Sequence, residues 1–297
     1  MAINAFLRPC TFNQPRFIEF FPYGQHMRLL LGLGKACHPL PTVVVSLVIT
    51  AFAWSLGWSG RSLAFVFITI FVGQLSVGWS NDAHDASLDS KVGRVSKPVV
   101  AQEVSVRTLW VAAITALFMS IVLSWLVAGW VGGSFHVLAL VMAWLYNLRL
   151  SRTAWSWLPY AVAFGSAPAF LTYGLNGEPP TFWSVAMFAI IGVSAHLANA
   201  LPDAEIDASA DMGGAVVSLG PRRSLLLCWL LLAVGGGILF VVSIGAHTWL
   251  AAAVSVVFIL AVIVGSVSHR REAMFYAVIG VVVVDVATLV AVTAITH

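Results

Sequence analysis

The sequence predicts an all-α polytopic membrane protein, and two properties of its composition lead to that class. Of the 297 residues, 60% are hydrophobic and only 9% are charged, and the mean hydropathy is +0.95. A soluble domain of this length needs far more polar surface, and the apolar residues form runs long enough to cross a bilayer as helices. The net charge is only +3, so no nucleic-acid partner is expected, and no stretch points to a protein partner.

The chain begins with a segment that is too polar to span the membrane. No apolar core precedes Arg16 and no small-residue cleavage site is present, so no removable signal peptide is expected. The stretch His26–Lys35 is predicted to lie on the membrane surface as a short amphipathic helix. The predicted division is therefore a cytoplasmic N-terminal segment, 1–36, followed by a nine-helix membrane domain, 37–297.

Nine apolar segments of spanning length follow this N-terminal segment. The predicted spans are 39–58, 63–81, 106–128, 131–148, 155–175, 181–202, 224–245, 248–267 and 274–296. When they are laid out in order, Arg61 alone among the fifteen lysines and arginines falls on the side opposite the N-terminus. Since positive residues concentrate on the cytoplasmic side, the N-terminus is predicted to be cytoplasmic and His297 outside.

A first acidic motif ends the second span on the cytoplasmic side. Its residues are Asn81, Asp82, Asp85 and Asp89, followed by the cations Arg94 and Lys97. If the apolar run continues as a helix, the three carboxylates fall within a stripe about 60° wide. Because such a stripe repels itself, it predicts a divalent cation among the carboxylates, and the cations beyond suggest that this metal arrives with an anion.

A second acidic motif ends the sixth span in the equivalent place. Asp203, Asp207 and Asp211 recur every fourth residue, which puts them on a stripe about 80° wide. Ordinary solvated loop acids would be spaced irregularly and mixed with lysines. The separation of four spans suggests an internal repeat whose two carboxylate ladders face a shared centre, and Mg²⁺ is the natural ion for such oxygen ligands together with phosphate.

These paired motifs, N-D-x-x-D-x-x-x-D and D-x-x-x-D on spans two and six, resemble those of the UbiA superfamily of intramembrane prenyltransferases. The resemblance covers nearly the whole chain from about residue 36 and implies a UbiA-like bundle in which Mg²⁺ bridges the aspartates to the diphosphate of an isoprenyl donor. It implies metal ligation by Asp82, Asp85, Asp89, Asp203, Asp207 and Asp211. It assigns catalytic roles to Asp82, Asp85, Asp203, Asp207, Arg94 and Lys97, and diphosphate contact to Asn81.

The loop after the fourth span supplies further candidate substrate-binding residues. Tyr146, Arg149 and Arg152 resemble the family's Tyr-Ser followed by a basic residue, with Asn147 in place of the serine. The family often has Arg-Pro before its first span, where this chain has His38-Pro39. Arg149 is equally compatible with contact to lipid headgroups.

Polar and aromatic side chains within the spans are candidates for binding the acceptor. Asn199 and His196 lie on the stripe of the second motif, and Gln74 lies on that of the first. Interhelical hydrogen bonding is the alternative for all three, and the better interpretation of Gln74. The candidate aromatic wall residues, which would shield a carbocation, are Tyr146, Trp157, Tyr160, Phe164 and Tyr173. Asp285, within the ninth span, has no predicted role.

The leading functional prediction is an Mg²⁺-dependent prenyltransferase that moves an isoprenyl group from its diphosphate to a lipophilic acceptor. That acceptor is an aromatic or quinone precursor or another isoprenoid. A terpene cyclase would use the same diphosphate site without an acceptor. A cation or proton transporter is a third alternative, but it favours acids near the middle of the membrane, whereas both motifs lie at cytoplasmic helix ends.

Overall fold

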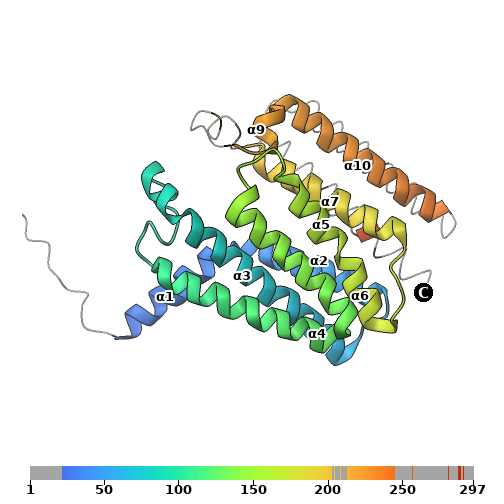
Figure 1. Ribbon diagram of the computed structural model, residues 1–297, viewed down its shortest axis with the longest axis horizontal. Helices are drawn as coiled ribbons and strands as arrows, with labels where there is room; N and C mark the ends of the chain where they lie inside the picture. Colours follow the sequence, from blue (N-terminus) through green and yellow to red (C-terminus); the bar gives the residue numbers. More distant parts are fainter. Residues whose placement is uncertain are drawn as a thin grey trace, which may run out of the picture.

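The computed structural model describes residues 22–202 and 213–244, together with the isolated positions 204, 208, 256, 280, 287, 288 and 290. Within these residues the protein consists of helices and their connections, without a strand (Figure 1). The helices are α1 (Pro22–Ala36), α2 (Pro39–Ser55), α3 (Gly60–Val92), α4 (Val106–Leu145), the π-helix η1 (Tyr146–Leu150), α5 (Trp157–Gly165), α6 (Ala167–Asn176), α7 (Phe182–Ala200), α9 (Ala215–Leu219) and α10 (Pro221–Ile244).

Four of the described helices are long and apolar enough to cross a membrane. They are Gly60–Lys91, Val106–Leu150, Phe182–Ala200 and Pro221–Val242. A fifth span results if α1 and α2, which bend by 60° at their junction, are counted together. The all-α membrane class is therefore confirmed. The count of nine spans stays a prediction, because 248–267 and 274–296 fall outside the described residues apart from a few isolated positions.

The helix α4 is a hairpin of two legs that correspond to the predicted spans 106–128 and 131–148. Twelve residues of straight helix would separate two side chains by about 18 Å, yet Ser124 Oγ lies 2.7 Å from His136 Nδ1. The reversal occurs at Gly129, whose φ of 64° and ψ of −174° lie outside the helical region. Only glycine adopts this conformation readily, which places the turn at this residue.

The fifth predicted span, 155–175, is divided into two shorter helices. α5 ends at Gly165, and α6 begins directly after Ser166 with Pro168 in its first turn. Proline has no amide hydrogen to donate to the carbonyl four residues earlier, so a continuous helix is interrupted here. The spans predicted at 181–202 and 224–245 correspond to α7 and α10.

The helix α3 carries the whole first acidic motif. The predicted span ended at residue 81, but the helix continues to Val92 and stops at Gly93, which has the left-handed φ of 73° that favours glycine. Asp82 and Asp89 are both buried on this helix, and Asp85 is partly buried. All three carboxylates therefore project from the last turns of one long helix.

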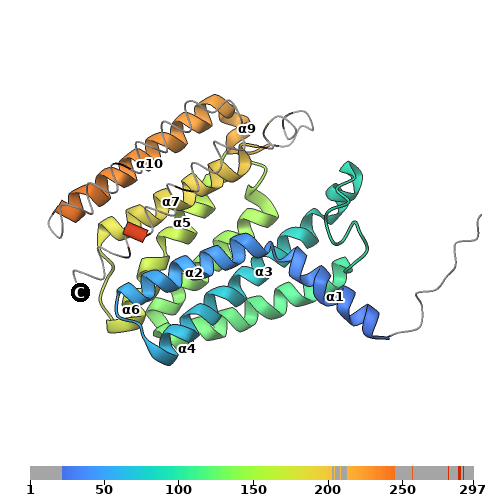
Figure 2. The same ribbon diagram turned by 180° about the vertical axis from the view of Figure 1, so that it is seen from behind.

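The bundle encloses its apolar core between α2, α3, α6 and α7. Phe52, Phe170 and Phe188 are almost fully buried there, and the rings of Phe52 and Phe188 lie 4.9 Å apart. α10 packs along α7 at one edge, and α1 extends from the opposite edge, beyond the start of α2 (Figure 2). The indole of Trp79 donates to the carbonyl of Leu33 at 2.9 Å, which ties α1 to α3.

Candidate functional site

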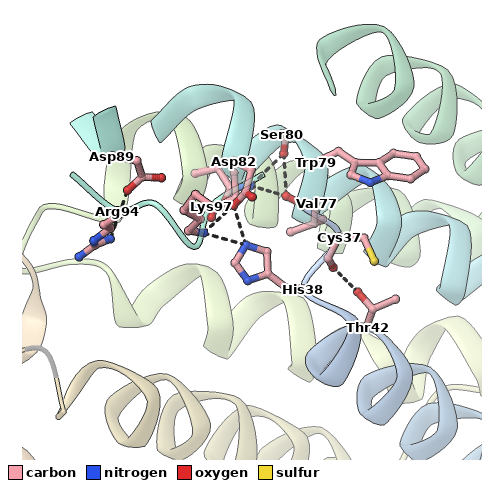
Figure 3. Close-up of polar contacts among 12 residues, drawn as sticks. Cys37, His38, Thr42, Val77, Trp79, Ser80, Asp82, Asp89, Arg94 and Lys97 are labelled. Carbon is pink, nitrogen blue, oxygen red and sulfur yellow. Dashed lines mark hydrogen bonds and ion pairs between the residues drawn. The ribbon is translucent and has the colours of Figure 1, made fainter. Parts of the chain in front are cut away.

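Asp82 is the centre of a buried polar cluster at the end of α3. Its carboxylate oxygen Oδ1 accepts from Lys97 Nζ at 2.6 Å and lies 2.9 Å from His38 Nε2, and its side chain is only 3% exposed. Figure 3 shows Lys97 and His38 side by side, both directed at Asp82, with Lys97 Nζ 3.5 Å from His38 Nε2. Since an isolated buried carboxylate is costly, these two partners account for its burial.

The other two carboxylates of the stripe have cations of their own. Arg94 Nη1 lies 3.3 Å from Asp89 Oδ1, and Arg152 Nη2 lies 2.8 Å from Asp85 Oδ1. The predicted repulsion between the carboxylates is therefore offset by one basic side chain for each acid. Asp85 is the most accessible of the three, with 29% of its side chain exposed.

A close approach between two backbones positions His38 against Asp82. Gly78 lies one helical turn before Asp82, and a Cβ atom added to it would collide with the carbonyl of Cys37. His38 itself has a left-handed φ of 53°, which redirects the chain between α1 and α2. The missing side chain at Gly78 therefore lets the Cys37–His38 turn press onto α3, where the imidazole meets the carboxylate.

The π-helix η1 brings a second group of polar residues to α3. Asn147 is buried and donates from Nδ2 to the carbonyl of Val77 and to Ser80 Oγ, both at 2.9 Å. Asn81 Nδ2 lies 3.5 Å from Asn147 Oδ1. The asparagine that replaces the expected serine thus joins η1 to the helix turn that precedes Asp82.

His196 of α7 faces a serine at the start of α5. Its Nε2 is 2.9 Å from Ser156 Oγ, and the same hydroxyl accepts from the amide of Ala215 at 3.0 Å. The rings of Tyr160 and Tyr146 pack on the imidazole with centroid separations of 4.6 and 5.6 Å. His196 therefore connects α7 to the start of α5 and to α9.

A cavity of about 400 Å³ extends from these polar residues into the bundle. Its mouth is lined by His38, Asn81, Asn147 and Asn199. Its interior is mainly apolar and is lined by residues of α2, α3, the second leg of α4 and α6, among them Ile49, Ile70, Leu140, Ala167 and Phe170. The cavity thus has a polar end beside the carboxylate–cation pairs and an apolar end within the membrane-spanning helices.

The second acidic motif lies outside the described residues, since Asp203, Asp207 and Asp211 are not described. Gly213, which follows this motif closely, nevertheless lies against a residue that pairs with the first motif. A Cβ atom at Gly213 would collide with the carbonyl of Arg152, the residue whose guanidinium pairs with Asp85. In the described part of the chain, no group of three or more His, Cys, Asp or Glu side chains is arranged to hold a metal ion.

The remaining predicted residues divide into those that reach the cavity and those that do not. Tyr146, Tyr160, Phe164, Gln74 and Asn199 are among the side chains that line it. Trp157 packs on Trp155 and Tyr173 packs on Phe135, and neither is a lining residue. Arg149 is exposed on η1 and makes no ion pair with a described residue. Asp285 lies outside the described residues.

Sequence reasoning did not assign a role to His38 or to His136. His38 stood out only as a departure from an Arg-Pro pattern, and its contact with Asp82 depends on residues 44 positions apart in the chain. His136 lies within an apolar run, where a lone histidine is itself a signal of function in a membrane helix.

Comparison with known proteins identifies a family and solved structures that resemble this chain. The sequence model of the UbiA prenyltransferase family matches residues 40–292. A UbiA homologue from Archaeoglobus fulgidus bound to GPP and Mg²⁺ is 17% identical, with a TM-score of 0.64 over 91% of this chain and 99% of that chain.

Two further solved structures have the same fold. The apo UbiA homologue from Aeropyrum pernix K1 is 16% identical, with a TM-score of 0.64 over 82% of this chain and 97% of that one. A digeranylgeranylglyceryl phosphate synthase is 13% identical, with a TM-score of 0.65 over 90% and 99% of the respective chains. No curated protein sequence matches the chain significantly.

Proposed function

Because the chain belongs to the UbiA prenyltransferase family, we propose that it transfers an isoprenyl group from an isoprenyl diphosphate to a lipophilic acceptor. The acceptor is an aromatic or quinone precursor or another isoprenoid. The observation that carries this proposal is the cavity, whose polar mouth adjoins three carboxylate–cation pairs and whose interior is apolar. A molecule with a diphosphate head and a hydrocarbon tail matches both ends.

The diphosphate is proposed to bind at the polar mouth. Lys97, Arg94 and Arg152 already lie within ion-pair distance of carboxylates there, so each can exchange a carboxylate oxygen for a phosphate oxygen. Arginine binds two phosphate oxygens at once through its planar fork, and lysine acts as a point charge. Asn81 and Tyr146 at the mouth would orient the head, and exposed Arg149 would contact it from η1.

Mg²⁺ is the proposed cofactor, and the donor set fits it. The first motif offers only carboxylate oxygens, which Mg²⁺ prefers, and Asp85 is partly open to an incoming ion. Asp82, Asp85 and Asp89 would hold it together with Asp203, Asp207 and Asp211 of the second motif. When bound, the metal would neutralise charge on the diphosphate oxygens as the allylic carbon–oxygen bond breaks. A solved relative is bound to DMAPP and Mg²⁺.

The chain's own residues would protect the carbocation left by that cleavage. Tyr146, Tyr160 and Phe164 line the cavity near its mouth, where their π faces favour positive charge and their bulk excludes water. Asn199 lines the same region and is proposed to orient the acceptor. His196 is proposed to support the site through the rings of Tyr146 and Tyr160 that pack on it.

The protein is an integral membrane protein, and its orientation is proposed from charge. The concentration of lysine and arginine on one predicted side supports a cytoplasmic N-terminus and site and an external C-terminus. The division into an N-terminal segment, 1–36, and a membrane domain, 37–297, belongs to the same proposal. The lipid bilayer is proposed to surround the membrane domain and to supply both lipophilic substrates.

Substitution of Asp82→Asn tests the site directly. The change retains size but removes the charge that faces Lys97 and His38. Calorimetric titration of the purified protein with GPP and Mg²⁺ should show binding to the unaltered protein and at least about a tenfold loss of affinity in the variant, or about 1.4 kcal/mol. Glu178→Gln is the matched control, because Glu178 is an exposed acid in the connection between α6 and α7.

Retained binding in the Asp82 variant would contradict the proposed site. Release of diphosphate is then measured with and without a lipophilic acceptor. A cyclic hydrocarbon formed from GPP or its longer homologues in the absence of any acceptor would overturn the transferase in favour of the cyclase.

A further inference from the structure

Two polar side chains lie in the apolar half of the cavity. His136, on the second leg of α4, is 7% exposed, and Gln74 lies on α3. Each is one helical turn from an apolar lining residue on its own helix, Leu140 for His136 and Ile70 for Gln74. Polar groups at this depth of a membrane protein are costly, which makes them candidates for function.

The hydrogen bonds of Ser124 determine where the imidazole carries its proton. Ser124 Oγ lies 2.6 Å from the carbonyl oxygen of Ser120, and a carbonyl has no proton to give, so the serine hydroxyl donates to it. The same Oγ lies 2.7 Å from His136 Nδ1 and must accept there. His136 therefore carries its proton on Nδ1, and Nε2 of the neutral ring presents a lone pair.

That lone pair belongs to a ring that lines the cavity. No described residue donates a hydrogen bond to His136 Nε2. This atom is also not one of the fully buried side-chain atoms that lack a hydrogen-bond partner among the described residues, so it keeps some accessible surface. The ring is held on its other sides by Phe170, with centroids 5.0 Å apart, and by Ser124. The side chain of Gln74 likewise makes no hydrogen bond with a described residue.

A plain hydrocarbon tail would leave both groups unpaired. Burying an acceptor or an amide without a partner costs free energy, so a cavity built only for hydrocarbon would be lined by apolar side chains at these positions. We infer that the deep half of the cavity is a binding site for a hydroxyl group carried by a lipophilic ligand, donated to His136 Nε2 and contacted by Gln74. The inference rests on the proposed function, which supplies the ligand's orientation.

His136 and Gln74 lie too deep in the cavity to take part in the bond-breaking step. His136 precedes Tyr146 by ten residues of helix and Gln74 precedes Asp82 by eight, which correspond to about 15 Å and about 12 Å. The reacting carbon is bonded directly to the diphosphate, at the other end of the cavity. His136 and Gln74 therefore select a ligand by its far end. The hydroxyl lies either on the tail of the donor or on the acceptor.

Binding measurements on two matched pairs of ligands distinguish a hydroxyl on the donor from a hydroxyl on the acceptor. The first pair is geranyl diphosphate and its ω-hydroxylated form, each titrated with Mg²⁺. The second pair is a long-chain alkanol and the alkane of equal length, followed by the shift in Tm that each causes. The unaltered protein is expected to prefer the hydroxylated member of one pair by about tenfold. A preference in the first pair places the hydroxyl on the donor, and one in the second pair places it on the acceptor.

Two variants test the assigned residues. His136→Phe retains an aromatic ring against Phe170 but removes the lone pair, and Gln74→Met retains the length of the side chain. Both are expected to lose the preference for hydroxyl while binding geranyl diphosphate as well as before. Leu140→Met, an apolar change beside them, should keep the preference.

Equal binding of both members of both pairs by the unaltered protein, or a preference that survives in both variants, would overturn the inference. Failure to bind geranyl diphosphate at all would instead overturn the proposed function.

Discussion

At the scale of single residues, each aspartate of the first motif is neutralised by a basic side chain. Lys97, Arg94 and Arg152 come from segments before and after α4, yet each meets a different carboxylate. The pairing lets three acids share one helical stripe without strong repulsion. It also places three cations where a diphosphate is proposed to bind, so that binding exchanges one set of charge pairs for another.

Lys97→Met is predicted to weaken donor binding more than any change at an exposed lysine. The substitution removes the 2.6 Å contact with buried Asp82 and a cation proposed to bind phosphate. Loss of a hydrogen-bonded charge partner costs about 2 kcal/mol or more, so the Kd for GPP with Mg²⁺ should rise at least about 30-fold. The control is Lys35→Met, whose ion pair with Glu103 is largely exposed. Equal effects of the two changes would contradict this assignment.

Gly78→Ala is predicted to disturb the site without touching a charged group. The added Cβ would collide with the carbonyl of Cys37 and push His38 away from Asp82. We expect Tm to fall by several degrees, equivalent to about 1–3 kcal/mol for a strained close contact. Donor affinity should fall together with Tm. Gly236→Ala is the control, because it has open space around it in α10 and should be neutral or stabilising. An unchanged Tm at Gly78 would disprove the close approach.

At the scale of elements, the reversal within α4 determines which residues line the cavity. The hairpin at Gly129 folds the second leg back, so that its inner face, including His136 and Leu140, packs against α3 at Gly73. Ser120 of the first leg donates to the carbonyl of Thr69 at 3.0 Å, which holds both legs to the same helix. A straight helix of this length would leave the cavity without one wall.

Gly129→Ala is predicted to destabilise the protein through backbone conformation alone. Gly129 has φ 64° and ψ −174°, and a Cβ atom there would meet no other atom within 4 Å. The expected loss is about 1–3 kcal/mol, the cost of a side chain in this region. Thermal unfolding in detergent measures it. Gly34→Ala, in open space on α1, should not lower Tm, and the same small effect at both positions would contradict the assigned turn.

At the scale of the whole molecule, charge asymmetry gives an orientation that can be tested. The site lies at the end of the bundle where α3 ends and where η1 and α9 lie (Figure 1). The opposite end contains the connection from α2 to α3, whose Trp58 donates to the carbonyl of Leu171 at 3.1 Å. Arg61 follows this connection and is the single basic residue predicted on that side.

Cysteine labelling in intact cells is predicted to separate these two ends. Ala101→Cys lies in the exposed connection before α4, and Glu178→Cys lies in the exposed connection before α7. An impermeant maleimide should label Glu178→Cys from outside and should reach Ala101→Cys only after the membrane is opened. Both variants carry Cys10→Ser to lower the background, since Cys37 and Cys228 are buried. The reverse pattern would invert the proposed topology.

Much of the fold and of the site was predictable because it depends on local pattern. The apolar runs identified the spans that correspond to α3, both legs of α4, α7 and α10. The spacing of Asp82, Asp85 and Asp89 predicted that they share a stripe if the apolar run continues as a helix, and α3 carries all three. Hydrophobicity and helical period act over neighbouring residues, so the chain itself displays them.

What the sequence by itself determined is the class of protein, the helical stripe of the first motif and the type of chemistry those residues favour. Only the tertiary structure decided which cation meets which carboxylate, that His38 joins Asp82, and that His136 faces the cavity. These contacts join residues far apart in the chain. They depend on how closely helices approach, at glycines such as Gly78, and on where a long helix reverses, at Gly129. Such packing has no periodic signal in one sequence, because the partner of each side chain lies on another helix.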